Sequence, residues 1–537
     1  MANSRDERMR ILLINPFYPI SETPSPPLGL AYLAAALEQA GARVKILDFV
    51  VYPYSQAGLE TAVRSFKPHM AGATAVTMTV DHASRVLKDL KSIDPEILTV
   101  MGGPHVSFRA QKTLEETPEL DLIVLGEGEQ TAVELMQTVK SGGDLSAVNG
   151  IAFRRGSEIT TTPGRQFIAD LDTLPLPARH LLPLGRYRAL GLPATLTTSR
   201  GCPYPCIFCV GRKMGGARVR YHSSDRVVTE LAYLSKRQFE RINIADDLFT
   251  ASTDHCLSVC DAIQRHHLNI KWTAFARVDT VTAKLLSAMK AAGCTAVSFG
   301  VESANPAILK TIKKGIRLDQ IRQAVRLCLK VGISPNASFM LGLPGETRDT
   351  IKETIAFANS LQQEGLAYGF HILAPFPGTE VREHADRFGI QILTDEWSEY
   401  HANRAVVETV NAGRQQLNAV VSDWEKKYFQ YLGHIQKNIR AGTASADEVG
   451  QFENLQRAVT VYELMMKNMI EENGAWPHRE PPVKTAKNLK LLIDRIISIH
   501  KLDPKILESA LTQAVASGNL ICHAMDGRVK WQWQDYL

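Results

Sequence analysis

Short strand-like and longer helix-like segments alternate along two long stretches of the chain, residues 10–140 and 194–385. In the first stretch the apolar strand-like runs cover residues 10–15, 44–49, 71–77, 98–102 and 122–125, and a helix pattern at 28–40 follows the first of them. Strands that alternate with helices predict an α/β fold with parallel sheets. Such folds collect their ligand-binding groups at the carboxyl ends of the strands, so the residues just after each strand are the candidates for chemistry.

Three cysteines, Cys202, Cys206 and Cys209, follow the first strand of the second stretch, within TTSRGCPYPCIFC. Thiolates this close together can hold three corners of a four-iron cluster, and an electron-transfer cluster usually has a fourth cysteine. No fourth cysteine lies nearby, so one iron would stay open to bind and activate a small molecule. The alternatives are three unrelated thiols or a zinc site, but zinc takes four ligands, usually as two pairs, and the sequence has no second pair.

The spacing Cys-x-x-x-Cys-x-x-Cys, with the aromatic Phe208 before the third cysteine, resembles the radical S-adenosylmethionine (radical SAM) superfamily. The resemblance implies a 4Fe-4S cluster on the three cysteines, with SAM chelating the open iron through its amino and carboxylate groups and Phe208 beside it. It also implies that an electron from the cluster cleaves SAM, and that the 5′-deoxyadenosyl radical released abstracts hydrogen from a substrate. An external electron donor, a flavodoxin or ferredoxin, is implied as a partner.

The first stretch carries glycine-rich loops after two of its strands, residues 102–105 (GGPH) and 126–129 (GEGE). Glycine there lets the backbone approach a large ligand closely. With the segments INPFYP and PPLGLAYLAAALEQAGARVKILD, these loops resemble the cobalamin-binding domain found ahead of many radical SAM domains. The resemblance implies a doubly wound, Rossmann-like fold and cobalamin contacts from Pro16, Gly102, Gly103, His105, Gly126, Gly128 and Glu129.

One departure from other cobalamin proteins concerns the lower face of cobalt. Those proteins carry an Asp-x-His-x-x-Gly loop whose histidine ligates cobalt, and neither His82 nor His105 matches that spacing. The lower face is therefore expected to be open or water-bound. The alternative for this half is a flavodoxin-like domain that binds another ligand or none.

Residues 194–385 hold six strand–helix units, which match the partial (β/α)6, TIM-like barrel of radical SAM enzymes. Polar residues stand at successive strand ends, and the resemblance assigns them to SAM. Asp246 and Asp247 would receive its ammonium group, since a carboxylate or carbonyl suits that cation, and Arg277 would pair with its carboxylate. Glu302 would accept hydrogen bonds from the ribose hydroxyls, and Ser338 lies on the fifth strand.

Each of these polar residues also has a purely structural interpretation. An aspartate of the 246–247 pair could cap the next helix. Arg277 could pair with Asp279, and Glu302 could pair with Lys313 or Lys314. Their occurrence at successive strand ends after the cysteines favours the SAM site.

The remaining segments are a connector and a tail. The connector, 147–193, contains a hairpin pattern at 148–165 that turns near Gly156, then a proline-punctuated linker. Helix patterns at 424–440, 459–472, 485–500 and 504–516 precede a predicted hairpin at 520–533 around Asp526-Gly527. The tail is thus mainly helical and ends in a β-hairpin, with Trp531 and Trp533 on one face. It resembles a small winged-helix-like module, and a structural cap on the barrel is favoured over a binding module. We predict domains at 1–146, 147–193, 194–390 and 391–537.

Composition limits the partners and the compartment. The 537-residue chain has a formal net charge of only +5 and no basic run, so no nucleic-acid partner is expected. No apolar run approaches the ~20 residues of a membrane span, and the charged N-terminus does not read as a signal peptide. The five cysteines outside the triad are scattered and read as buried free thiols. We therefore expect a cytoplasmic protein.

The resemblance implies a cobalamin-dependent radical SAM C-methyltransferase, acting at an unactivated carbon of a small or lipid-like molecule through methylcobalamin and the 5′-deoxyadenosyl radical. One alternative is a tetrapyrrole ring cyclase, like the anaerobic magnesium-protoporphyrin ester cyclases, or another cobalamin-dependent radical rearrangement. A third hypothesis, from another class, is a cobalamin- or metal-binding sensor with the tail as a nucleic-acid module. The sequence names neither the substrate nor the oligomeric state.

Overall fold

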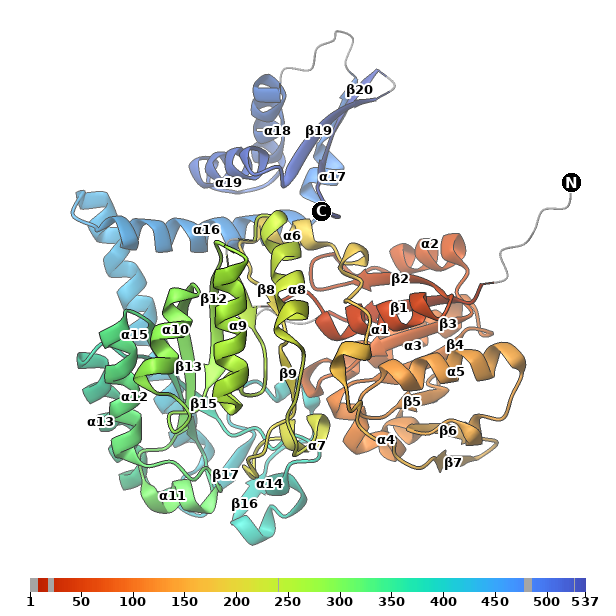
Figure 1. The fold of residues 1–537 in the computed structure, drawn as a ribbon. Helices are drawn as coiled ribbons and strands as arrows, with labels where there is room; N and C mark the ends of the chain where they lie inside the picture. The colour runs from red at the N-terminus through yellow and green to blue at the C-terminus, as the bar shows by residue number, and fades with distance from the viewer. Residues whose placement is uncertain (1–7, 18–23, 240, 478–484, 526) are drawn as a thin grey trace, which may run out of the picture.

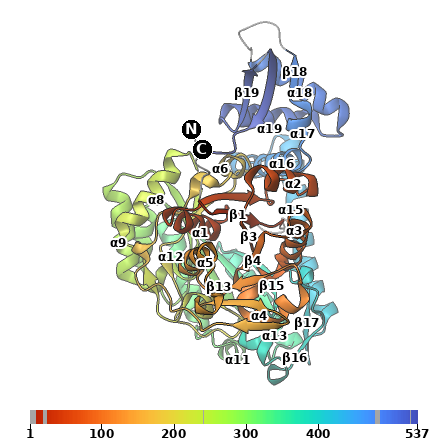
Figure 2. The same ribbon diagram turned by 90° about the vertical axis from the view of Figure 1, so that its right-hand side faces the viewer.

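Figure 1 shows the computed structural model, which describes residues 8–17, 24–239, 241–477, 485–525 and 527–537. Two α/β units lie side by side, and a small module follows them beyond a long helix, α16 (Ala446–Met466) (Figures 1 and 2). The mixed α/β fold with a mainly helical C-terminal region confirms the predicted fold class.

The N-terminal unit is built on a seven-stranded sheet of order β2-β1-β3-β4-β5-β6-β7. Its parallel strands are β1 (Arg10–Asn15), β2 (Arg43–Asp48), β3 (Met70–Thr74), β4 (Leu98–Gly102) and β5 (Leu122–Val124), and its helices are α1 (Leu28–Gln39), α2 (Gln56–Phe66), α3 (Val80–Ile93), α4 (Pro104–Glu116) and α5 (Glu129–Ser141). The order 2-1-3-4-5 is a doubly wound one whose ligand crevice lies between β1 and β3. Strand β3 is shorter than predicted, because a 3-10 turn at Thr77–Thr79 leads into α3.

The predicted hairpin at 148–165 is present as β6 (Ile151–Arg155) and β7 (Glu158–Thr161), with Gly156 in the turn at φ +66°. It is not an isolated connector, because β6 pairs antiparallel with β5. The hairpin thereby satisfies the backbone groups that an edge strand would leave unpaired. The N-terminal sheet therefore continues through residue 161.

The second unit contains the six predicted parallel strands, in the order β15-β14-β13-β12-β11-β8. They are β8 (Ala194–Leu196), β11 (Arg241–Ile244), β12 (Lys271–Ala276), β13 (Cys294–Glu302), β14 (Ser334–Leu341) and β15 (Ala367–Ile372). Helices α8 (Ser224–Lys236), α9 (Thr253–Arg265), α10 (Ala283–Ala291), α11 (Pro306–Thr311), α12 (Leu318–Val331) and α13 (Arg348–Gln363) follow them. Strand β8 stops at Leu196, and Ser199–Arg200 instead forms β9, which pairs with β10 (Arg220–Tyr221) beside the cysteine loop.

The chain after the barrel divides into two parts by its packing. Strands β16 (Ile390–Ile392) and β17 (Val407–Thr409) and the first half of α15 (Arg414–Ala441) share the barrel's core, to which Leu417 and Val421 belong. A second core forms among α16, α17 (Met469–Asn473), β18 (Ala475–Pro477), α18 (Thr485–Ile499), α19 (Pro504–Ala516), β19 (Leu520–Met525) and β20 (Arg528–Trp533). Three of these strands form an antiparallel sheet, β18-β20-β19.

The predicted terminal hairpin is present as β19 and β20. Trp531 and Trp533 are both buried in the second core, which confirms that they share one face. Of the predicted turn pair, Gly527 has φ +71°, and Asp526 lies outside the described residues. The helices of the tail overlap the predicted ones, but α15 and α16 begin 10 and 13 residues earlier. The predicted helix at 459–472 is divided between α16 and α17, because Asn468 adopts a left-handed backbone conformation at φ +48°.

A buried ion pair ties the N-terminal unit to the barrel. The guanidinium of Arg179 lies 3.0 Å from the carboxylate of Glu230 on α8, and both side chains are at most 4% exposed. The hydroxyl of Tyr32 on α1 donates to the same carboxylate over 3.0 Å. The Glu230 carboxylate thus connects α1 of the N-terminal unit with α8 of the barrel.

We predict that Glu230→Ala lowers the free energy of unfolding by about 3–5 kcal/mol, because it leaves Arg179 buried without a counter-charge. The control is Asp349→Ala, which breaks the exposed pair with Lys352 and should cost less than about 1 kcal/mol. Urea unfolding followed by circular dichroism measures both. Equal costs for the two variants would contradict the structural role assigned to Glu230.

Candidate functional site

The three cysteines lie on the loop between β9 and α7 (Gly211–Gly215), where they line a cavity of about 650 Å³ at the carboxyl ends of the barrel strands. The other residues that were predicted for SAM line the same cavity: Phe208, Asp246, Asp247, Arg277, Glu302 and Ser338. Residues that the sequence analysis did not single out for the site also line it, among them Tyr204, Phe275 and Asn336. The topology therefore gathers residues from five barrel strands and the cysteine loop into one place.

The thiols of the triad are free, and burial raises the pKa of each, that of Cys209 to about 11. Within the described residues, no three His, Cys, Asp or Glu side chains are placed to hold a single metal ion. In an iron–sulfur cluster each thiolate binds a different iron atom, so the three sulfur atoms need not converge on one point. Because the thiols are protonated at neutral pH, iron must displace their protons on binding.

Asp246 is buried and is hydrogen-bonded entirely within the protein. Its carboxylate accepts from the backbone N–H and hydroxyl of Thr198 and from the hydroxyl of Ser199, each over 2.6 Å. Burial raises its pKa to about 6, against the lowering effect of these bonds. Asp246 thus anchors the segment that leads into the cysteine loop, and exposed Asp247 is the carboxylate of the pair that stays open to the cavity. Neither caps the next helix, since Ser252 caps α9.

For Arg277 and Glu302 the sequence left open two roles, a structural ion pair and a contact to SAM, and the geometry is compatible with both. The Arg277 guanidinium donates to both oxygens of Asp279, over 2.9 and 2.8 Å, and lies 3.6 Å from the ring centre of Tyr204. Glu302 accepts from the ammonium of Lys314 over 2.7 Å, whereas Lys313 pairs with Glu380 instead. Both residues still line the cavity, so these pairs hold them in place at its wall.

The backbone of Glu302 is unusual. The residue has φ +68°, in the left-handed region that a non-glycine residue rarely adopts, and the register of β13 against β14 shifts between Gly300 and Glu302. A bulge of this kind re-aims a side chain at the end of a strand. Strained backbone of this sort concentrates at functional sites.

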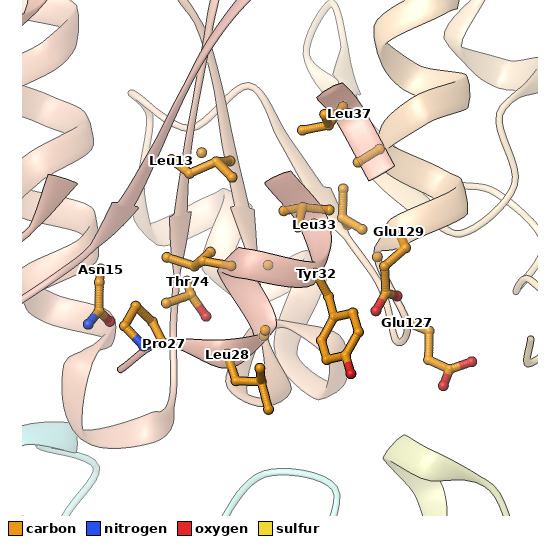
Figure 3. A pocket seen from close by; sticks show the side chains of 18 of the residues that line it. Leu13, Asn15, Pro27, Leu28, Tyr32, Leu33, Leu37, Thr74, Glu127 and Glu129 are labelled. Carbon is orange, nitrogen blue, oxygen red and sulfur yellow. The ribbon is translucent and has the colours of Figure 1, made fainter. Parts of the chain in front are cut away.

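The second cavity, of about 600 Å³, lies at the β1–β3 crevice of the N-terminal unit and reaches the barrel. Figure 3 shows Leu13, Leu33 and Leu37 along one part of the cavity, and Asn15, Thr74, Tyr32 and Glu127 along another. Five of the seven residues predicted for cobalamin line it: Gly102, Gly103, Gly126, Gly128 and Glu129. The cavity thus has an apolar part and a polar part.

Gly103 shows why the first loop needs glycine. Its φ is +108°, and a Cβ at this position would lie 2.6 Å from the carbonyl oxygen of Ala75. Only a residue without a side chain lets the start of α4 approach the end of β3 this closely.

The other two residues predicted for cobalamin, Pro16 and His105, do not line this cavity. Pro16 is buried beside Asn15, which does line it. His105 is buried; its Nδ1 lies 3.2 Å from the Thr77 hydroxyl, and its ring packs edge-on against Trp397, 4.9 Å between centres. Burial lowers the pKa of His105 to about 4, so the neutral ring acts as packing between the two units.

Four charged residues join the two cavities. Arg200, at the end of β9, pairs with Glu127 and Glu129 over 3.2 and 2.6 Å, and Arg220 on β10 pairs with Glu127 over 2.9 Å. The sequence analysis missed these arginines, because nothing in their spacing signals a partner about 70–90 residues earlier. Ala245, just past β11, lines both cavities. The two sites therefore adjoin.

Comparison with known proteins agrees with this division. A B12-binding domain model matches residues 21–136, and a radical SAM superfamily model matches residues 196–358. An uncharacterized methyltransferase of Pyrococcus horikoshii is 36% identical over 77% of this chain and 91% of its own length. An anaerobic magnesium-protoporphyrin IX monomethyl ester cyclase of Rubrivivax gelatinosus is 30% identical over 68% of this chain and 69% of its own.

Among solved structures, the cobalamin-dependent S-adenosylmethionine radical enzyme OxsB, with aqua-cobalamin and S-adenosylmethionine bound, shares the fold, with a TM-score of 0.68 at 19% identity over 97% of this chain and 82% of its own. The chain belongs to the radical SAM superfamily and carries the B12-binding domain ahead of its barrel. No helix of the described residues is long and apolar enough to cross a membrane.

We predict that Cys206→Ala removes most of the iron and the broad absorption near ~400 nm from anaerobically reconstituted protein, because cluster thiolates cannot be spared. The control is Cys328→Ala, which alters a buried thiol on α12, outside the cavity. Full retention of iron in Cys206→Ala would contradict the assignment of the triad.

We predict that Gly72→Leu abolishes cobalamin binding. Gly72 lies on β3 in the wall of the second cavity, where a Cβ would sit 3.6 Å from Leu13, so a larger side chain must occupy the cavity itself. Absorption spectroscopy of the protein after cobalamin loading measures the loss, and unchanged iron content serves as the control for folding. Wild-type cobalamin content in this variant would show that the ligand binds elsewhere.

Proposed function

We propose that the protein is a cobalamin-dependent radical SAM C-methyltransferase that acts on a small-molecule substrate. The observation that carries the proposal is the shared wall of the two cavities at Ala245. One cavity contains the cysteine triad, and the other lies at the ligand crevice of a B12-binding domain. Two cofactors in adjoining cavities can act on one substrate, and the methyltransferase relative covers most of this chain.

The residues present fit the implied cofactors. Cys202, Cys206 and Cys209 supply three thiolates and leave one iron without a protein ligand, the arrangement that SAM requires. Arg277, Glu302 and Asp247 line the same cavity, and they would bind the carboxylate, ribose and ammonium of SAM. The second cavity has the volume of a large-ligand site, and its glycine loops suit a close backbone approach by cobalamin.

When bound, SAM at the cluster supplies the radical that removes a substrate hydrogen, and cobalamin supplies the methyl group. The protein's own part is orientation and water exclusion. Lys314 fixes Glu302, Asp279 fixes Arg277, and Asp246 fixes the strand that enters the cysteine loop. Hydrogen removal by a radical requires no general base, so the neutral His105 and the hydrogen-bonded Asp246 need not transfer protons.

The decisive experiment is anaerobic incubation of protein loaded with cluster and cobalamin, with SAM and a reductant. We expect 5′-deoxyadenosine and S-adenosylhomocysteine to form together, and both to be lost in Cys206→Ala, as liquid chromatography with mass spectrometry will show. When cobalamin is omitted, formation of S-adenosylhomocysteine should stop before formation of 5′-deoxyadenosine does. If neither product forms when both cofactors are bound, the proposal is wrong.

A ring cyclase is the second candidate, because the Rubrivivax gelatinosus cyclase is 30% identical over two thirds of this chain. It predicts 5′-deoxyadenosine without S-adenosylhomocysteine. The same incubation therefore separates the two activities even while the substrate is unidentified.

Three further assignments belong to this proposal. A flavodoxin or ferredoxin would supply the electron, and the free cysteines of the described residues suit a reducing cytoplasm. The chain would divide into functional units at 1–146, 147–193, 194–390 and 391–537. The last would act as a cap rather than a nucleic-acid module, since its tryptophans are buried and Arg186 anchors it through Glu471 and Asp535.

A further inference from the structure

A third cavity, of about 430 Å³, lies between the barrel and the C-terminal module, away from the two cofactor sites. It is enclosed by α6 (Leu184–Ala189), the carboxyl end of α8, the start of β11, α16 and α19. Arg241 opens β11 at the amino end of the strand, whereas the cysteine cavity lies at the carboxyl ends. The third cavity is therefore at the opposite end of the barrel from the reaction site.

Three arginines from three different elements line this cavity: Arg188 just before the end of α6, Arg241 at the start of β11, and Arg457 on α16. Two of them lie at Gly191. Exposed Arg241 donates from Nη2 to the Gly191 carbonyl over 2.9 Å, and Nη2 of Arg457 lies 3.7 Å from the position of a Cβ on Gly191. Guanidinium groups that line one space from separate elements can each donate to the same anion.

The described residues offer these arginines only neutral partners. Arg188 donates to the Asn519 side chain over 2.6 Å and to the carbonyls of Arg237 and Ser517 over 3.0 and 3.2 Å. Arg457 donates to the Asn454 side chain over 2.9 Å. None of the described lining residues is acidic.

Arg186, two residues before Arg188 on the same helix, is paired with carboxylates, as buried arginines usually are. It pairs with Glu471 and Asp535 over 2.8 and 2.7 Å. The chain thus supplies carboxylates to a neighbouring arginine but, among the described residues, supplies none to the cavity.

We propose that this cavity binds a phosphate-bearing small molecule between the barrel and the C-terminal module. Guanidinium groups recognise phosphate oxygens through paired, charge-assisted hydrogen bonds, and three of them on separate elements can surround one polyphosphate. The volume is that of a small-molecule site. Amide and hydroxyl groups of Gln238, Gln513 and Ser235 complete a polar lining.

The location gives the ligand a structural consequence. Arg188 already connects the barrel, through Arg237, to the C-terminal module, through Asn519 and Ser517. An anion held by Arg188, Arg241 and Arg457 would add a second connection between the same parts. The bound molecule would therefore stabilise the docking of the module, and it would not be a reactant, since the cysteines lie at the other end of the strands.

Isothermal titration of the full chain with inorganic pyrophosphate tests the proposal, at constant ionic strength set with sodium chloride. We expect one site per chain, and Arg241→Gln and Arg457→Gln should each weaken binding by about tenfold or more, because each removes one charge-assisted contact. Arg457→Lys keeps the charge and should retain part of the affinity. Arg348→Gln, which alters an exposed arginine outside the cavity, should bind as wild type does.

Three outcomes would overturn the proposal. They are no binding of pyrophosphate, equal binding in the Gln variants and wild type, or equal weakening in Arg348→Gln. Thermal unfolding and iron content of each variant show that the chain is folded and loaded.

Discussion

The ion pairs between Arg200, Arg220, Glu127 and Glu129 are the interactions on which the arrangement of the two sites depends. Glu127 and Glu129 belong to a loop of the B12-binding domain, and Arg200 lies two residues before Cys202. The loop that lines one cavity is thereby fixed to the segment that carries the cysteines of the other. All four side chains are less than 20% exposed, so the pairs are shielded from water and gain more from their attraction than exposed pairs do. The bond from Tyr32 to Glu230 and the packing of His105 on Trp397 also join the two units, but these four charged residues are the ones that connect the walls of the two cavities.

Arg277 and Glu302 in the cysteine cavity share one arrangement: each is paired with a charged residue of the protein and still lines the cavity. Asp279 holds Arg277, and Lys314 holds Glu302, whose left-handed backbone and neighbouring bulge aim its side chain. A preformed ion pair lowers the conformational entropy that a ligand must overcome. The structural interpretation of these residues and the ligand-binding one are therefore compatible, and each partner pre-orients the group that SAM would meet.

The sequence predicted most of the fold, because periodicity and strand-end residues depend on local rules. The six barrel strands, the doubly wound sheet and the terminal hairpin all follow from such patterns. The six residues assigned to SAM lie together because parallel strands place their carboxyl ends at one edge. Prediction was poorer where tertiary contacts determine the end of a strand or its pairing partner. Strand β8 stops early because Ser199 pairs with Tyr221, and the hairpin at 151–161 joins a sheet edge that no local signal announces.

The same limit explains why one predicted residue lies outside the cavity lining and why others were not singled out. His105 belongs to the glycine-rich loop that was predicted to contact cobalamin, yet its side chain packs on Trp397, almost three hundred residues later in the chain. Asn15 and Tyr32 line the second cavity and lie in segments that carried the resemblance, but neither was singled out for the site; Arg200 lines it too and belongs to no cobalamin motif. The three arginines of the third cavity come from residues 188, 241 and 457, so only the folded chain shows that they converge.

The central claim is that cobalamin and the iron–sulfur cluster lie in adjoining cavities and act on one substrate. Electron paramagnetic resonance of protein loaded with both, with cobalt as Co(II) and the cluster reduced, tests it most directly. The account predicts that each signal is split or broadened by the other relative to protein loaded with one centre alone. Two spectra that simply add, each unperturbed by the other centre, would contradict it.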